Sequence, residues 1–184
     1  MSAKLIYVMG PSGAGKDSLM RWVMHNKNAS MKLHWAKRLV TRHWPQGEGS
    51  DEHVSLEDFE KLLENQALAM HWFAHDLHYG ILNSELMSHP PDAWLLINGS
   101  RAYFSRALEL YPQLLAIHIT ASTPTLEERL NQRARESEDK ISSRLTRPQL
   151  VKPEGDVPWL DVLNEGDLKD GGQQILSFLS TRHF

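Results

Sequence analysis

The chain has 184 residues, of which 41% are hydrophobic and 23% are charged, a composition typical of one globular domain with its own core. The absence of cysteine excludes disulfide frameworks and thiolate zinc sites. A net charge of −3 gives no bulk electrostatic case for nucleic acid, and the N-terminal apolar run is too short to span a membrane.

Strand-like and helix-like segments alternate along the chain. Short apolar runs rich in β-forming residues predict strands over residues 5–9, 33–41, 68–74, 94–97, 114–120 and 160–163. Helical spacing predicts helices that include residues 19–24, 100–110 and 168–179. Capping and proline signals predict a short helix after Ser55 with Asp58 as partner, another capped by Asn83, and one with Pro124 at its first position. Residues 42–54 are predicted to form a loop.

This alternation predicts an α/β fold, with a mainly parallel sheet covered on both faces. We expect a single domain over residues 1–184. Its core would comprise about 1–33, 93–132 and 151–184, interrupted by two insertions of about 34–92 and about 133–150.

A glycine-rich loop follows the first strand and opens the first helix. The spacing is G-x-x-x-x-G-K, which is the phosphate-binding pattern of P-loop nucleotide-binding proteins. Inward-turned backbone N–H groups and the positive end of the helix would hold the phosphates of ATP, with Lys16 reaching the β- and γ-phosphates. The residues expected to bind the nucleotide are Gly10, Pro11, Ser12, Gly13, Ala14, Gly15, Lys16, Asp17 and Ser18.

The loop departs from the usual pattern at the residue after the lysine. A serine or threonine there ligates Mg²⁺ in most P-loop enzymes, but this chain has Asp17, followed by Ser18. The strand 94–97 is followed by Asn98 and carries no carboxylate at its end. We expect Asp17, or Ser18 beside it, to bind Mg²⁺; the alternative is that Asp17 only complements the positive end of the helix.

The chain resembles the guanylate-kinase group of nucleoside monophosphate kinases over nearly its full length. The matching features are GPSGAGK, Thr41-Arg42, Gly47-Glu48, Tyr79-Gly80 and an arginine-rich segment near residue 133. Other details are more similar to the ribose 1,5-bisphosphate phosphokinase family of bacterial phosphonate metabolism, namely Lys16-Asp17-Ser18, INGSRA at 97–102 and HWFAHDLHYG at 71–80. This resemblance implies a P-loop NTPase fold with an acceptor-binding insert over about 34–92 and an arginine-rich lid over about 133–150.

The family resemblance also implies an acceptor site. Arg38 and Arg42 would hold an acceptor phosphate, because a guanidinium fork binds phosphate in a bidentate manner. Tyr79 would contribute its hydroxyl, and Arg101, at the carboxyl edge of the sheet, would contact the acceptor or the transferred phosphate. The alternatives are a solvated basic edge for the first two arginines, a packed tyrosine, and a structural ion pair for Arg101.

Two further assignments follow from the resemblance. Arg133 and Arg144 would close over ATP as part of the lid and neutralise charge during transfer, unless they form a solvated helix face. Asn164 matches a polar position near adenine, although a turn residue would explain it nearly as well.

The resulting prediction is an ATP- and Mg²⁺-dependent kinase that converts ribose 1,5-bisphosphate to 5-phospho-α-D-ribosyl 1-diphosphate in the cytoplasm. It has a phosphorylated sugar as partner, with no nucleic acid and no membrane, and the sequence leaves a homodimer open. The alternatives are a guanylate kinase that acts on GMP and a non-catalytic guanylate-kinase-like interaction module.

Overall fold

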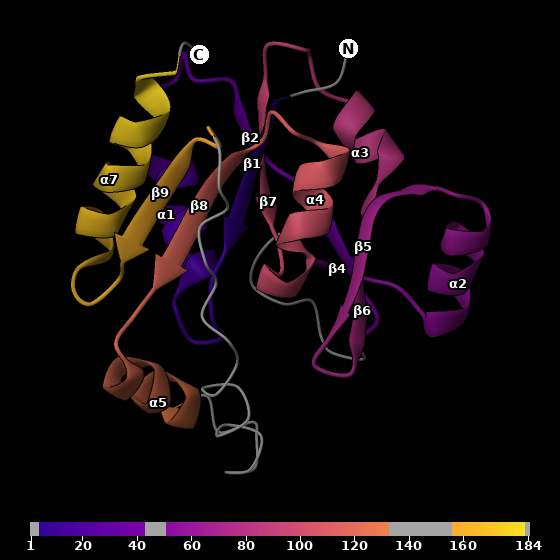
Figure 1. Cartoon of the computed structure of the whole chain (residues 1–184), viewed down its shortest axis with the longest axis horizontal. Helices are drawn as coiled ribbons and strands as arrows, with labels where there is room; N and C mark the ends of the chain where they lie inside the picture. The colour runs from indigo at the N-terminus through magenta and orange to yellow at the C-terminus, as the bar shows by residue number, and fades with distance from the viewer. Residues whose placement is uncertain (1–3, 43–50, 133–155, 183–184) are drawn as a thin grey trace.

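A computed structural model describes residues 4–42, 51–132 and 156–182. Its strands form two sheets, one of five strands and one of four (Figure 1). Within the described residues, no helix is long and apolar enough to cross a membrane.

The five-stranded sheet forms the centre of the fold. Its order is β2-β7-β1-β8-β9, and every neighbouring pair is parallel, as the alternation of strands and helices predicted. The strands are β1 (Lys4–Met9), β2 (Leu33–Trp35), β7 (Trp94–Asn98), β8 (Leu115–Thr120) and β9 (Trp159–Leu163). Because parallel strands point the same way, the loops that follow β1, β7 and β8 meet at one edge of the sheet.

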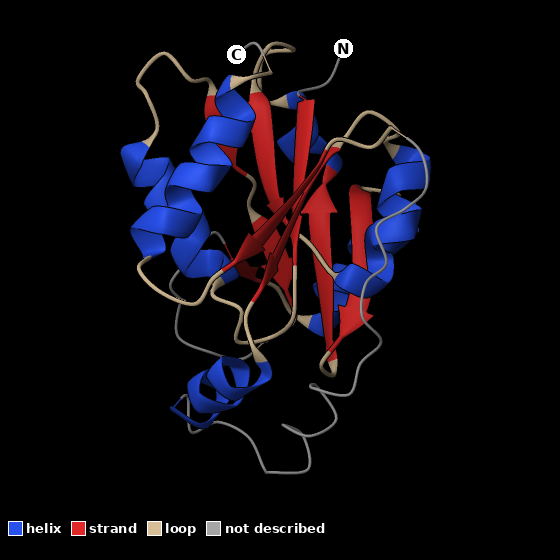
Figure 2. Cartoon of the chain, turned by 60° about the vertical axis from the view of Figure 1, so that its left-hand side comes forward, coloured by secondary structure: helices blue, strands red, loops and turns tan. Residues whose placement is uncertain are grey.

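Alternate side chains of this sheet enter two separate hydrophobic layers. Ile6 and Val8 of β1 pack with the apolar faces of α1 (Lys16–Asn26) and α7 (Leu168–Ser180). Tyr7 and Met9 of the same strand point the other way, toward α4 (Phe104–Leu110) and the second sheet. Figure 2 shows helices on both sides of the strands, as predicted for a sheet covered on both faces.

The second sheet is built from the segment between β2 and β7. Its order is β4-β3-β6-β5, with β3 and β4 parallel and the other pairs antiparallel. The elements are β3 (Arg38–Val40), β4 (Asp51–His53), α2 (Leu56–Glu64), β5 (Leu68–Ala74), β6 (Leu77–Leu82) and α3 (Asn83–Met87). As Figure 1 shows, α2 lies on the side of β5 and β6 that faces away from the central sheet.

Two sequence predictions in this segment were wrong, and one strand was missed. The single strand expected over 33–41 is two strands in different sheets: the N–H of Ala36 still donates to the carbonyl of Leu96, whereas Leu39 pairs with Gly80. The expected loop over 42–54 ends in the short strand β4. The strand β6 was not predicted at all.

The helix starts were predicted with mixed success. The capping pair at α2 is confirmed, because the Ser55 side chain accepts a hydrogen bond from the N–H of Asp58. Asn83 does not cap α3 but is its first residue, and its side chain donates to the carbonyl of Gln66 at 2.7 Å. The helix α5 (Thr123–Gln132) begins one residue before Pro124, and the N–H of Leu126 donates to the Ser122 carbonyl. Ser122 therefore occupies the capping position, and Pro124 is the second helical residue.

Candidate active site

The candidate site lies at the carboxyl edge of the central sheet. The loop after β1 leads into α1, the strand β7 ends at Asn98, and β8 leads into α5. In Figure 1, β8 and β9 run toward α5, which lies beyond the edge of the sheet. The predicted phosphate-binding loop is therefore bordered by elements that are far apart in the sequence.

The phosphate-binding loop has the backbone of an anion site. Gly15 precedes α1 with a φ of 81°, a left-handed conformation that a residue with a side chain rarely adopts, and no side chain caps the helix. The first N–H groups of α1 carry the positive end of the helix dipole. The Lys16 ammonium donates to the carbonyls of Gly10 and Pro11 at 3.1 and 3.0 Å, so the loop itself holds it.

Asn164 supports this loop from the other side. Its side chain is 3% exposed, and its amide Nδ2 donates to the carbonyl of Ala14 at 2.8 Å. A Cβ atom on Gly15 would lie 2.4 Å from the same nitrogen, so the close approach also requires glycine there. The amide oxygen of Asn164 is buried and has no hydrogen-bond partner in the described part of the chain. This asparagine is therefore more than a turn residue.

A pocket of about 280 Å³ opens beside the loop. Its lining includes Ser18, Arg129 and Asn164, together with the two loop glycines at 13 and 15. The structure thus brings Ser18 and Asn164 together on one side of the loop, away from the contacts of Asp17 described below.

Arg129 is a site residue that the sequence analysis did not select. One guanidinium nitrogen, Nη1, is buried without a hydrogen-bond partner among residues 4–42, 51–132 and 156–182. The same atom would lie 3.8 Å from a Cβ on Gly15. A buried, unpaired guanidinium N–H beside a phosphate-binding loop is a donor available to an anion. The only sequence signal was its position on an arginine-bearing helix face.

Glu165 holds α5, and with it Arg129, next to the loop. Its carboxylate accepts hydrogen bonds from the backbone N–H of Ser122 and, at 2.7 Å, from the hydroxyl of Thr125. The Ser122 N–H and then the Thr125 hydroxyl lower the pKa of Glu165. The side chain is therefore a carboxylate at neutral pH, which suits an acceptor at the start of a helix.

Asp17 faces Asn98 rather than the pocket. The side chain of Asn98, which is 4% exposed, donates from Nδ2 to the Asp17 carboxylate. The first turn of α1 is thereby connected to the end of β7. The oxygen of the Asn98 amide is buried and has no partner in the described residues.

Arg38, the first residue of β3 in the second sheet, also contacts Asn98. Its Nε and Nη2 each donate to Asp51 at 2.9 Å, and its Nη1 donates to the Asn98 carbonyl at 2.9 Å. Burial opposes the charge of the guanidinium, but the hydrogen bonds and charge of Asp51, with Asp17 further away, raise the pKa of Arg38 above its ordinary value. Arg38 is therefore a permanent cation that connects the two sheets, and not a solvated edge residue.

The other predicted acceptor residues are Tyr79, Arg42 and Arg101, and they differ in how far they are buried. The Tyr79 ring is 7% exposed, stacks on Trp72 at 5.7 Å and lies 4.9 Å below the Arg38 guanidinium. Arg42 is exposed and follows β3 by two residues. Arg101 is half-buried and begins the short 3-10 helix η1 (Arg101–Tyr103), three residues after Asn98. Arg133 and Arg144 lie outside the described residues.

The segment after Asn98 is fixed by Tyr7. The Tyr7 hydroxyl donates to the carbonyl of Ser100 at 2.9 Å and accepts from its N–H at 3.0 Å. Burial raises the pKa of this hydroxyl far above its ordinary value, so it stays protonated and can donate. The Tyr7 ring covers Gly99 so closely that a Cβ there would lie 2.1 Å from ring carbon Cζ.

We expect Gly99→Ala to lower the melting temperature by several degrees, because the added methyl group must displace the buried Tyr7 ring. Overpacking of this kind costs about 1–3 kcal/mol, and each kcal/mol lowers the melting temperature by roughly 2–4 °C in a chain of this length. Gly166→Ala is the matched control, since a Cβ at Gly166 would meet nothing within 4 Å. Thermal unfolding followed by circular dichroism compares the two variants, and equal melting temperatures would contradict this packing.

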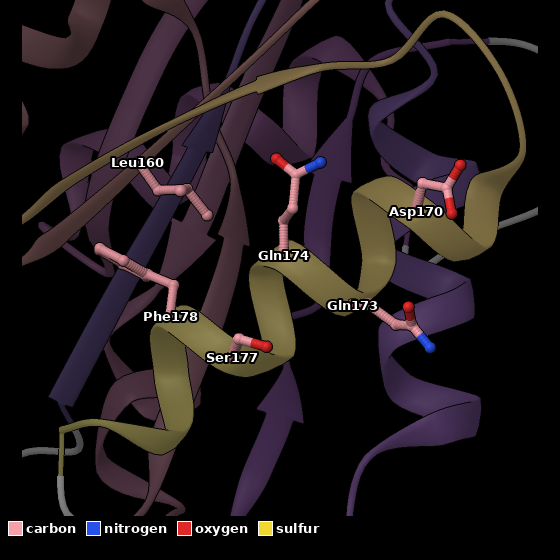
Figure 3. A pocket seen from close by; sticks show the side chains of 6 residues that line it. All are labelled: Leu160, Asp170, Gln173, Gln174, Ser177 and Phe178. Atoms are coloured by element: carbon pink, nitrogen blue, oxygen red, sulfur yellow. The ribbon is translucent and has the colours of Figure 1, made fainter.

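A larger surface depression lies elsewhere, between β9 and α7. Figure 3 shows its lining side chains, Leu160, Asp170, Gln173, Gln174, Ser177 and Phe178. Asp170 is the one charged side chain in this lining and it is negative, so the depression has nothing to neutralise a phosphate. The anion-binding features of the described chain are at the loop after β1.

The donor set at the loop fits Mg²⁺ bound together with a nucleotide. Among the described residues, no three His, Cys, Asp or Glu side chains gather into a metal site of their own. Mg²⁺ in phosphoryl-transfer enzymes needs only one or two carboxylates, with phosphates and waters completing its octahedron. Asp17 supplies such a carboxylate in the first turn of α1, and the side-chain nitrogen of Asn98 donates a hydrogen bond to it.

Two proteins similar to this chain in sequence share one name. The chain is 38% identical over 180 residues to "Ribose 1,5-bisphosphate phosphokinase PhnN" of Thiobacillus denitrificans, a match that covers 96% of this chain and 93% of that protein. It is 35% identical over 178 residues to the protein of the same name from Rhizobium etli, with coverages of 95% and 88%. A scan against protein-family models finds no matching family.

Solved structures show the same fold. A guanylate kinase from Anaplasma phagocytophilum aligns with a TM-score of 0.67 at 16% identity, covering 100% of this chain and 88% of that one. A gluconokinase from Sinorhizobium meliloti aligns with a TM-score of 0.53 at 18% identity, covering 98% and 93%. At these identities the likeness establishes the P-loop α/β kinase fold alone.

Proposed function

Since this chain belongs to the family of ribose 1,5-bisphosphate phosphokinases, we propose that it transfers the γ-phosphoryl group of ATP to the 1-phosphate of ribose 1,5-bisphosphate. The product is 5-phospho-α-D-ribosyl 1-diphosphate. The observation that carries this proposal is the contact of the phosphate-binding loop, through Asp17 and Asn98, with the half-buried cation Arg38 of the second sheet. A donor-phosphate site and an acceptor-facing cation thus share one edge of the fold.

The donor nucleotide would lie along the loop after β1. The backbone N–H groups at the start of α1 bind its phosphates, and Lys16 leaves the carbonyls of Gly10 and Pro11 to reach the β- and γ-phosphates. Arg129 supplies a further donor from its unpaired Nη1. The pocket lined by Ser18 and Asn164 would receive the rest of the nucleotide.

Mg²⁺, when bound with ATP, would withdraw negative charge from the phosphoryl group in transfer. Asp17 is the residue we assign to hold it. Ser18 is the weaker candidate, because it lines the nucleotide pocket while Asp17 faces Asn98 and the acceptor side.

The acceptor would lie between the end of β7 and the second sheet, with residues 34–92 as the acceptor-binding unit. Arg38, Arg42, Tyr79 and Arg101 are the residues we assign to it. Asp51 occupies the bidentate fork of Arg38. Two cations with different environments, the half-buried Arg38 and the exposed Arg42, would suit an acceptor that carries two phosphates.

The chemistry needs alignment and charge neutralisation rather than a base. A non-bridging oxygen of the acceptor 1-phosphate attacks the γ-phosphorus, and the bond from that phosphorus to the β,γ-bridging oxygen breaks, releasing ADP. Because a phosphate monoester has its second pKa near about 6, this oxygen is already ionised at neutral pH. Lys16 and the loop N–H groups stabilise the leaving ADP, and we assign Arg133 and Arg144, in the lid over about 133–150, to the charge that develops in transfer.

A phosphorus NMR time course with ATP, Mg²⁺ and ribose 1,5-bisphosphate tests this proposal. We expect the 1-phosphate signal to be replaced by the coupled pair of a diphosphate while the 5-phosphate signal stays unchanged. Conversion of GMP to GDP in a parallel reaction, with no change in the sugar, would make the chain a divergent guanylate kinase. Nucleotide binding without turnover of either acceptor would favour the non-catalytic interaction module. The expected site of action is the cytoplasm, where ATP is available.

A further inference from the structure

Asn98 occupies the junction between the loop and the second sheet. It is the last residue of β7, where it pairs with Val8 of β1, and its side chain is 4% exposed. Its side-chain nitrogen donates to Asp17, and its backbone carbonyl accepts from Arg38. One buried residue therefore contacts both the carboxylate assigned to the metal and the cation assigned to the acceptor.

The orientation of the Asn98 amide follows from its neighbours. An ionised carboxylate can only accept hydrogen bonds, so the Nδ2 donor must face Asp17 and the Oδ1 acceptor must face away from it. That oxygen has no partner among the described residues although it is buried.

An asparagine suits this position better than a second carboxylate would. Two carboxylates in contact repel each other when no cation is present. The amide instead holds the single carboxylate of Asp17 in one orientation without adding charge.

We propose that Asn98 is a positioning residue for the divalent metal: its Nδ2 holds the Asp17 carboxylate in the orientation that binds the ion. The inference rests on the proposed function only in requiring that a metal–nucleotide complex binds at the loop. It does not depend on which acceptor is phosphorylated.

The test measures metal affinity without turnover. Mn²⁺ is titrated into the full chain saturated with a non-hydrolysable ATP analogue, and free Mn²⁺ is followed by electron paramagnetic resonance. We expect Asn98→Ala to weaken Mn²⁺ binding by about 10- to 100-fold, the usual effect of removing a partner that orients a metal ligand. Affinity for the analogue without metal should stay unchanged. Asn98→Leu keeps the side-chain volume and should give the same loss, which separates the lost hydrogen bond from a packing defect.

Two comparisons decide whether Asn98 acts through Asp17. In the double variant Asp17→Asn/Asn98→Ala, Mn²⁺ affinity should fall little further than in Asp17→Asn alone, because residues that act as one unit are not additive. Asn164→Ala, the matched buried asparagine on the other side of the loop, should weaken the analogue with and without metal alike. Unchanged Mn²⁺ affinity in both Asn98 variants would overturn this inference but not the proposed function. So would a double variant in which the losses of Mn²⁺ affinity from the two single changes add. Absence of any metal–nucleotide binding by the wild type would overturn the proposed function as well.

Discussion

Lys16→Met is expected to lower kcat/KM by about 10²–10³-fold, with little change in melting temperature. The variant keeps the length of the side chain and loses the charge that stabilises the β- and γ-phosphates in the transition state. The Lys16 ammonium donates to the carbonyls of Gly10 and Pro11, which water can satisfy once the ammonium is gone. A coupled assay for ADP release measures the rate.

The matched control for this prediction is Lys61→Met. Lys61 is an exposed lysine of α2 that pairs with Glu57, and its loss should leave the rate unchanged. A Lys16→Met enzyme that retains the wild-type rate would show that the loop does not bind the transferred phosphate, and the proposed donor site would then be wrong.

Arg38→Lys is the second large effect that we expect. Lysine keeps the positive charge but has no planar fork, so it cannot hold Asp51 in a bidentate manner and reach the Asn98 carbonyl at once. Losing hydrogen bonds between charged groups costs about 1.5–3 kcal/mol each, so the melting temperature should fall by several degrees. KM for the acceptor should rise about 10-fold or more, while KM for ATP changes little.

Arg106→Lys provides the control for that variant. Arg106 also pairs with a carboxylate, Glu109, but its side chain is 59% exposed, and exposed ion pairs contribute little. An Arg38→Lys enzyme with unchanged acceptor KM and a lowered melting temperature would show that Arg38 only joins the two sheets. In that case Arg42 and Arg101 would have to bind the acceptor without it.

The phosphate-binding loop was predictable because every part of it is local. The glycines, Lys16 and the start of α1 lie within a few consecutive residues that follow an apolar strand. The spacing alone therefore specified both the conformation and the chemistry. The parallel sheet was predictable for a related reason, since its central strands β1 and β7 contain uninterrupted apolar runs.

The second sheet was harder to predict because its signals are weak. The turn between β5 and β6 consists of His75 and Asp76, which have φ values of 55° and 60°. Such two-residue turns usually contain glycine or asparagine, so the hairpin carried no recognisable turn signature. The strand from residue 33 to 41 was predicted as one piece because the chain changes sheets at Ala36 and Lys37 without proline or glycine.

The cluster around Arg38 could not be predicted from spacing at all. Asp17, Asn98, Arg38 and Asp51 come from four elements, and the hydrogen bond between Asn98 and Asp17 joins residues 81 positions apart. Sequence analysis selected Asp17 and Arg38 for separate roles and noted that Asn98 replaces a carboxylate. Only the tertiary structure shows that these residues touch, and that Arg129 reaches Gly15 from α5.

The proposed acceptor is tested by the ratio of kcat/KM for ribose 1,5-bisphosphate to that for GMP. The two acceptors compete in one reaction with ATP and Mg²⁺. We expect a large preference for the sugar bisphosphate, lost when Arg38 is changed to lysine but kept in Arg106→Lys. Equal or greater turnover of GMP by the wild-type chain would contradict it.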